Sequence, residues 1–236
     1  REKLNWNVNF NASKFERRID EMPAGADQLT GNVGFGFSQI NREGYTPNSF
    51  YVFKQVYDQS GRAIEGAFAD LNSDGIINEA DRYLYKNGDP DFTFGFTSNL
   101  NYNNFDLSFN LRASVGNRVY NALEARNSFY AEIMNGVPNN LHTNVNNTQF
   151  LTYTGNQAVS DMFIENASFL RMDFVNLGYT FQNWLEGKAK LRVFTGVQNP
   201  FIITKYGGLD PEIVGGIDQA IYPRQRQYLF GCNIKF

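Results

Sequence analysis

The residues best suited to chemistry lie in one acidic loop, DLNSDGIINEAD, at positions 70–81. Side chains that carry oxygen recur at its alternate positions, and Gly75 allows a sharp turn in the middle. This spacing is typical of calcium loops. It predicts one structural Ca2+ whose ligands are Asp70, Asn72, Asp74, the main-chain carbonyl of Ile76, Asn78 and Asp81.

A turn without metal is the alternative for this loop, because Asp, Asn and Gly are also the commonest turn residues. Its twelfth position carries Asp81, a shorter side chain than the bidentate Glu of calcium sensors. No pair of flanking helices is evident either. We therefore expect the ion to stiffen the loop and not to act as a signal.

Few other side chains carry reactive groups. Asp210 and Glu212 suggest a pair of catalytic carboxyl groups, but Pro211 between them favours a turn, and spacing alone does not give glycosidase geometry. One histidine, His142, and one cysteine, Cys232, are too few for a histidine zinc site or an internal disulfide. We expect no enzyme activity and assign no catalytic residues, with a glycan-cleaving domain as an alternative.

Composition narrows the classes of protein further. The 236 residues include 21 basic and 24 acidic side chains without a basic cluster, which argues against nucleic-acid binding. Aromatic residues reach 16%, with 22 Phe and 13 Tyr, a mixture that favours strands. No apolar stretch approaches the roughly 20 residues of a membrane helix.

The elements that position these residues are predicted to be strands, because apolar and polar residues alternate with a period of two. In 3–11, for example, Leu4, Trp6, Val8 and Phe10 alternate with asparagines. Seven such segments occur, and FLRMDF before one of them is out of phase, which predicts a bulge near Phe174. The predicted strands are 3–11, 48–58, 91–102, 104–115, 175–181, 188–198 and 227–236, of which 48–58 is aromatic on both faces.

The connections between these strands alternate in length. Asn103 and Asn104 favour a tight hairpin, and 181–188 is also short. The segments 58–91, 117–167 and 200–222 are long, and 118–134 is compatible with a short helix. Short turns at one end and long loops at the other are typical of outer-membrane barrels. Charges gather on the polar faces as candidates for ion pairs or a lined passage: Asp106, Arg112, Lys188, Lys190 and Arg192.

Alternation alone also fits a secreted, soluble β-sandwich that binds glycans and carries a calcium-stiffened loop. Two features favour the barrel. Phe and Tyr are dense at the predicted strand ends, as in an interfacial girdle, and the polar faces are rich in Asn, Thr and Ser, as in a wet lumen.

Several blocks of the chain resemble SusC/RagA-type TonB-dependent transporters of the Bacteroidetes outer membrane, in order and approximate spacing. The likeness covers at least about 45–236. The blocks are ADLNSDGIINEADRY, GDPDFTFGFTSNLNYNNFDLSF, GNRVYN, ENASFLRMDFVNLGYTF, VQNPFIITKYGGLDPE and YPRQRQYLFGCNIKF.

This resemblance implies an all-β fold, in which residues 1–236 form the C-terminal part of a 22-stranded transmembrane barrel. The plug and the N-terminal strands then belong to another part of the same transporter, and residue 1 is not the biological start. The implied activity is uptake of oligosaccharides or peptides across the outer membrane. The implied partners are a SusD/RagB-like surface lipoprotein, the TonB complex acting through the plug, and outer-membrane lipid.

The resemblance also orients the chain. It places the 58–91 loop, with the candidate calcium site, and the 117–167 loop outside the cell. The aromatic C-terminus, Phe236 with Ile234 and Gly231 before it, resembles the signal read by the barrel-assembly machinery. Substrate-binding residues stay unassigned.

Overall fold

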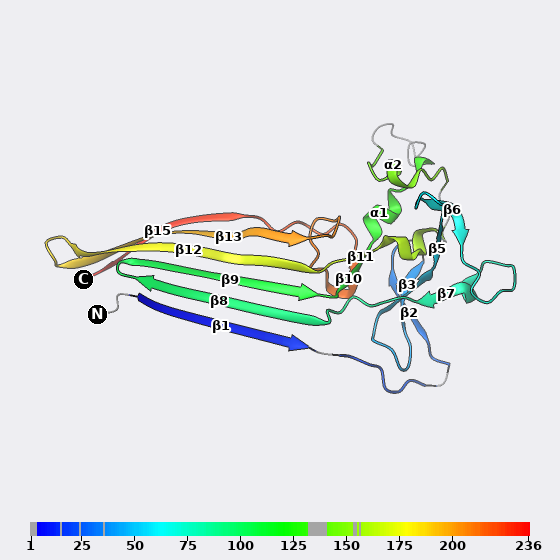
Figure 1. Cartoon of the computed structure of the whole chain (residues 1–236), viewed down its shortest axis with the longest axis horizontal. Coiled ribbons are helices and arrows are strands. Elements are labelled where there is room, and N and C mark those ends of the chain that lie inside the picture. The colour runs from blue at the N-terminus through cyan, green and yellow to red at the C-terminus, as the bar shows by residue number, and fades with distance from the viewer. Residues whose placement is uncertain are drawn as a thin grey trace.

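The computed structural model describes residues 4–14, 16–23, 25–34, 36–131, 141–152, 155 and 157–236. It has two parts: a long sheet, and at one end of it a head (Figure 1). We define the head as the described residues of the connections 15–91, 116–168 and 205–226. The first strand of the described chain begins, and the last one ends, at the end of the sheet that is far from the head (Figure 1).

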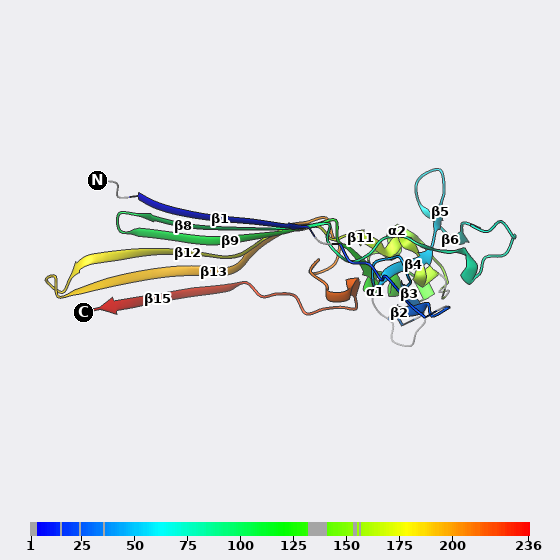
Figure 2. The same ribbon diagram turned by 90° about the horizontal axis from the view of Figure 1, so that it is seen from below.

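Six strands form the long sheet, in the order β1-β8-β9-β12-β13-β15. Every neighbouring pair is antiparallel. The sheet is curved when seen edge-on (Figure 2). Its strands are β1 (Leu4–Lys14), β8 (Phe92–Tyr102), β9 (Phe105–Val115), β12 (Phe169–Trp184), β13 (Ala189–Thr204) and β15 (Gln227–Lys235).

The head contains three small sheets and short helices. One sheet has the order β2 (Gln28–Asn32), β3 (Phe37–Asn41), β4 (Ser49–Phe53), β7 (Arg82–Leu84), and another pairs β5 (Gln55–Tyr57) with β6 (Ala63–Phe68). The third has the order β11 (Ile164–Asn166), β10 (Arg118–Asn121), β14 (Ile217–Asp218). The helices are α1 (Ala122–Arg126) and α2 (Val145–Thr148). No helix in the described part of the chain is long and apolar enough to cross a membrane.

The two parts bury their apolar residues differently. The head has a compact core, in which Phe50, Val52, Phe53 and Tyr120 have no exposed side-chain surface. The long sheet instead leaves one apolar face open, so that Trp6 is 63% exposed. In the described residues no second sheet pairs or packs over this face, as a sandwich would require. The uncovered face therefore favours the barrel interpretation.

Polar groups on this apolar face are satisfied locally. Ser98 shares the face with the aromatic residues of β8, and it is only 4% exposed. The indole N–H of Trp6 donates a hydrogen bond to the Ser98 hydroxyl at 3.0 Å. A hydroxyl against hydrocarbon would otherwise lose its hydrogen bonds to water.

Six of the seven predicted strands are confirmed in the long sheet. The segment 48–58 is also mostly strand, but its assignment to the barrel wall as one long strand is wrong. That segment forms β4 and β5 in the head, and its aromatic residues occupy both faces because both faces are buried there. β1 consequently pairs directly with β8, so the first long connection is 15–91 and not 58–91. It also holds small sheets, whereas a loop without structure was expected. The predicted bulge is confirmed as a register shift between Met172 and Phe174.

Glycines keep the polar face of the long sheet flat. Gly178 of β12 is paired with Asp106 of β9 and Phe194 of β13, and the ion pair of Asp106 with Arg192 crosses above it. A Cβ at Gly178 would lie 2.5 Å from an Asp106 oxygen and 2.6 Å from Arg192 Nη2. Single side chains cover three other glycines of this face in a similar way: Asn11 covers Gly95, Asn176 covers Gly196 and Phe194 covers Gly231.

We predict that Gly178→Ala destabilises the intact barrel by about 1–2 kcal/mol, because the added methyl group displaces the ion pair. The urea midpoint of the barrel in detergent measures this. In an Arg192→Ala background most of the cost should disappear, since the displaced partner is gone. An equal cost in both backgrounds would show that the ion pair does not require the glycine.

Candidate functional site

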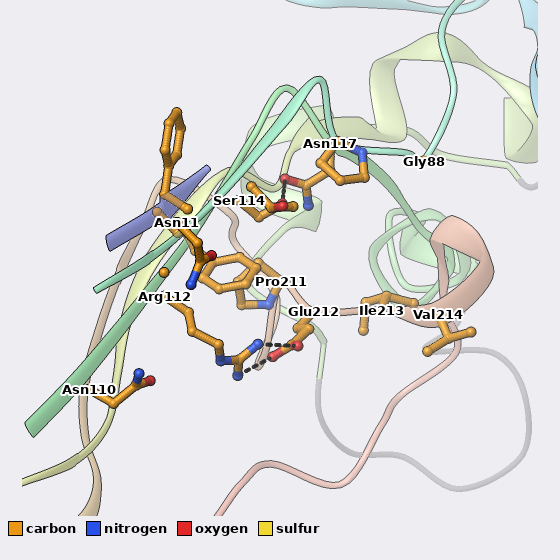
Figure 3. Close-up of a pocket in the computed structure, with 16 residues that line it drawn as sticks. Asn11, Gly88, Asn110, Arg112, Ser114, Asn117, Pro211, Glu212, Ile213 and Val214 are labelled. Carbon is orange, nitrogen blue, oxygen red and sulfur yellow. Dashed lines mark hydrogen bonds and ion pairs between the residues drawn. The ribbon is translucent and has the colours of Figure 1, made fainter. Parts of the chain in front are cut away.

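A polar pocket lies where the long sheet meets the head. Residues 207–216 follow β13 and fold back over the polar face of the sheet, so that Pro211 and Glu212 face β9 (Figure 3). The cavity between this loop and the strands has a volume of about 450 Å3. Its walls combine residues of β1, β8, β9 and β12 with the loop, including Asn11, Thr93, Asn110, Arg112, Phe169 and Val214.

A buried ion pair fixes the loop to the sheet. Arg171 of β12 donates to Asp210 at 2.5 Å, and their side chains are 4% and 5% exposed. Removing either partner would leave an uncompensated buried charge, which is costly. The pair therefore holds the start of the loop in one position against the barrel wall.

A second arginine joins the bulge to the same loop. Arg112 of β9 donates through Nε to Asp173 at 2.6 Å and through Nη1 to Glu212 at 2.9 Å. Asp173 lies at the register shift of β12, directly after Met172 of the apolar face, and its carboxylate is on the polar face beside Arg112. Arg224 closes the network with 2.9 Å to Glu212 and 3.4 Å to Asp210.

The chemistry of the pocket follows from this pairing. Arg112 and Glu212 line it and pair with each other, and the network behind them matches three arginines with three carboxylates, so the site has little net charge with which to attract ions. Asn11 and Asn110 present amides on one side, and Ile213 and Val214 present apolar surface on the other, with Val214 fully exposed. Such a surface suits uncharged, hydrogen-bonding ligands.

The arginine network also explains the two carboxyl groups that were considered as a catalytic pair and for which a turn was favoured. Asp210 and Glu212 both accept hydrogen bonds from arginines, and Asp210 also accepts the Glu212 N–H at 2.9 Å. Their oxygens hold the loop in place. Sequence reasoning missed Arg171, Asp173 and Arg224, and the only signal was the out-of-phase FLRMDF segment.

The predicted calcium loop lies elsewhere, between β6 and β7, and projects from the head away from the sheet (Figure 1). Asp81 is fully buried, and its carboxylate accepts the N–H groups of Leu71 and Asn78 at 2.9 and 2.8 Å. These bonds, above all that from Asn78, hold its pKa below the ordinary value. Asp70 accepts the N–H groups of Ser73 and Gly75.

Metal binding by this loop stays a prediction. Among the described residues no group of three or more His, Cys, Asp or Glu side chains is arranged to hold an ion. The described hydrogen bonds already fold the loop as a series of turns, which matches the metal-free alternative. A Ca2+ would have to compete with main-chain N–H groups for the same carboxylates.

The remaining predicted residues are spread over the molecule. Cys232 is exposed on the apolar face of β15. His142 lines a separate pocket in the head, with Glu124 and Asp218. Phe236 is 89% exposed and Ile234 is 46% exposed, and the Phe194 ring covers Gly231. Their proposed role as an assembly signal stays a prediction.

We predict that Asp210→Asn releases the loop, because Arg171 then keeps a buried charge without a countercharge. The expected cost is about 3 kcal/mol or more. Limited proteolysis of the intact protein should show faster cleavage within 205–226. The matched control is Asp27→Asn, which removes the exposed pair with Arg42 and should cost less than about 1 kcal/mol. Equal protease resistance of both variants would contradict the anchoring role.

Comparison with known proteins identifies relatives of this chain, although no protein-family model matches it. The chain is 39% identical over 245 residues to the TonB-dependent receptor SusC of Bacteroides thetaiotaomicron, covering 98% of the chain and 24% of the relative. It is 30% identical over 271 residues to the TonB-dependent receptor P3 of Formosa agariphila, covering 98% and 27%. It thus spans about a quarter of the length of these curated relatives.

Solved structures agree on the fold. The RagAB peptide importer in its open-open state superposes with a TM-score of 0.74 at 20% identity, over 100% of this chain and 27% of that one. A further structure of the RagAB peptide transporter gives 0.72 at 21% identity, over 97% and 27%. Sequence and fold therefore assign the chain to the barrel of a SusC/RagA-type TonB-dependent receptor.

Proposed function

We propose that the chain forms barrel wall and outward loops of an importer that takes up oligosaccharides or peptides across the outer membrane, driven by TonB. The uncovered apolar face of the long sheet carries this proposal, because only lipid offers it a matching surface. β1 and β15 each lack a neighbour on one side among the described residues. In a bilayer both edges need strands, which another part of the same protein would supply together with the plug.

The head points outward in this proposal. The short hairpin of β8 and β9 and the turn between β12 and β13 then face the periplasm, and the long connections face the exterior. A SusD/RagB-like lipoprotein is the proposed partner of the head. The structural neighbours support it, since they are RagAB complexes in which a RagA-type chain has a partner. Intact receptor purified in detergent should retain such a lipoprotein, and recovery of the receptor alone after mild extraction would count against it.

The pocket between β9 and residues 207–216 is the proposed contact for incoming substrate. It lies on the polar face at the head end of the sheet, where solutes would enter the barrel. Its amides offer hydrogen bonds to hydroxyl or peptide groups. The carboxylates of the pocket are held by arginines, which supports transport over catalysis.

We predict that Thr93→Trp lowers uptake several-fold, because the indole would fill much of the pocket beneath the loop. Cells that carry the intact receptor would be supplied with labelled oligosaccharides or with labelled peptides, and accumulation would be measured. Phe109→Trp is the control, since Phe109 faces away from the pocket on the apolar face. Undiminished uptake by Thr93→Trp would exclude this pocket from the substrate path.

Structural Ca2+ in the 70–81 loop is a separate proposal, supported by the ligand spacing. We predict that Ca2+ slows proteolysis of this loop in the intact receptor, because an ion would cross-link its carboxylates. Asp74→Asn keeps the acceptor for the Ile76 N–H but removes one charge, so it should weaken the Ca2+ effect about tenfold or more in affinity. If chelator and Ca2+ give equal cleavage rates, the loop is a turn without metal.

A further inference from the structure

A second group of carboxylates lies in the head, apart from the arginine network. Glu124 of α1, Glu165 of β11 and Asp218 of β14 surround Tyr206, and the charges of all three act on its hydroxyl. None of the three forms an ion pair within the described part of the chain, in contrast to every carboxylate of the pocket network. Their negative charges therefore have to be compensated in another way.

Two of these carboxylates share one donor. Asn121, which is 5% exposed, ends β10 and caps α1. Its Nδ2 donates to Glu165 at 2.8 Å and to Glu124 at 3.3 Å. Two carboxylates that face a single amide in a half-buried site repel each other when both are ionised. A proton shared between them removes the repulsion and adds a hydrogen bond.

The same carboxylates connect two of the long loops. Glu165 belongs to the 116–168 connection, and its other oxygen accepts the N–H of Gly207 at 2.7 Å. Gly207 lies near the start of the 205–226 connection, which contributes to the pocket. Next to it, Tyr206 donates to Asp218 at 2.7 Å, and Asp218 lies opposite Asn121 in the small sheet. The start of the pocket loop is therefore attached to the rest of the head at this point.

We propose that Glu124 and Glu165 form a proton-dependent clip that attaches the 205–226 loop to the 116–168 loop. While the pair shares a proton the clip is closed, and when both groups are ionised it loosens. The device depends only on the geometry of the head, so it does not rest on the proposed import function. The pH would then determine how firmly the 205–226 loop is held over the pocket.

The surroundings support this assignment. The groups that face Glu124 are Glu165 on β11, Asp218 on β14, Tyr206 after β13 and His142 before α2. Burial, then the hydrogen bond and the charge of Glu165, raise the pKa of Glu124 to about 7. Once the clip opens, Glu124 returns towards its ordinary pKa of 4.5 and binds fewer protons. The closed state is therefore most stable below that value and loses stability as the pH rises through about 7.

Hydrogen exchange of the Gly207 amide in the intact receptor tests the clip. After correction for intrinsic exchange, protection should fall by up to about tenfold per pH unit between about pH 5 and pH 7, and then level off. Glu124→Gln, which mimics the protonated form, should keep the high protection of low pH throughout. Glu165→Gln should move the loss of protection to lower pH, because burial alone then raises the pKa of Glu124.

Glu65→Gln is the matched control, because Glu65 also accepts main-chain N–H bonds in the head, but these hold its pKa below the ordinary value. Its profile above about pH 5 should follow the unmodified protein. The clip is disproved if protection of Gly207 does not change with pH in the unmodified protein. It is equally disproved if Glu124→Gln keeps the original slope, or if Glu65→Gln abolishes it.

Discussion

The hydrogen-bond ladder that runs from β1 to β15 is the constraint on which everything else depends. In hydrocarbon no water can satisfy a main-chain N–H or C=O group, so the strands must pair along their length. This requirement fixes the register, and the register in turn sends alternate side chains to lipid or to the interior. The apolar face, the polar wall and the positions of Arg112 and Arg171 all follow from that one ladder.

The ladder is interrupted at the register shift in β12, and this shift lies beside the arginine network of the pocket. At the shift between Met172 and Phe174 one extra residue enters β12, and Asp173 joins the polar face beside Arg112. Two consecutive residues, Asp173 and Phe174, then lie between Met172 and Val175 of the apolar face. The bulge thus keeps both flanking segments of β12 in phase with the apolar face while Asp173 stays on the polar face.

Sequence patterns were sufficient to predict the strands of the long sheet, because the alternation of apolar and polar residues can be seen within each strand alone. Each long strand carries its own two-residue period, and Asn103 with Asn104 marks a hairpin. The same argument failed for 48–58, since a short strand buried on both faces gives the same aromatic run as a membrane strand. The pocket was not predictable, because Arg171 and Asp210 are 39 residues apart and only the fold brings them together. Likewise, no local sequence pattern indicates that the carboxylates of Glu124 and Glu165 lie close together.

The glycines of the polar face have a consequence for the bore of the barrel. Where Gly95, Gly178, Gly196 and Gly231 occur, neighbouring side chains lie along the wall and do not project from it. Over this arc the covering side chains occupy the space that a Cβ would otherwise take. Space in front of the wall is therefore gained without adding strands, and the Arg192–Asp106 pair contributes charge to the wall while lying flat over Gly178.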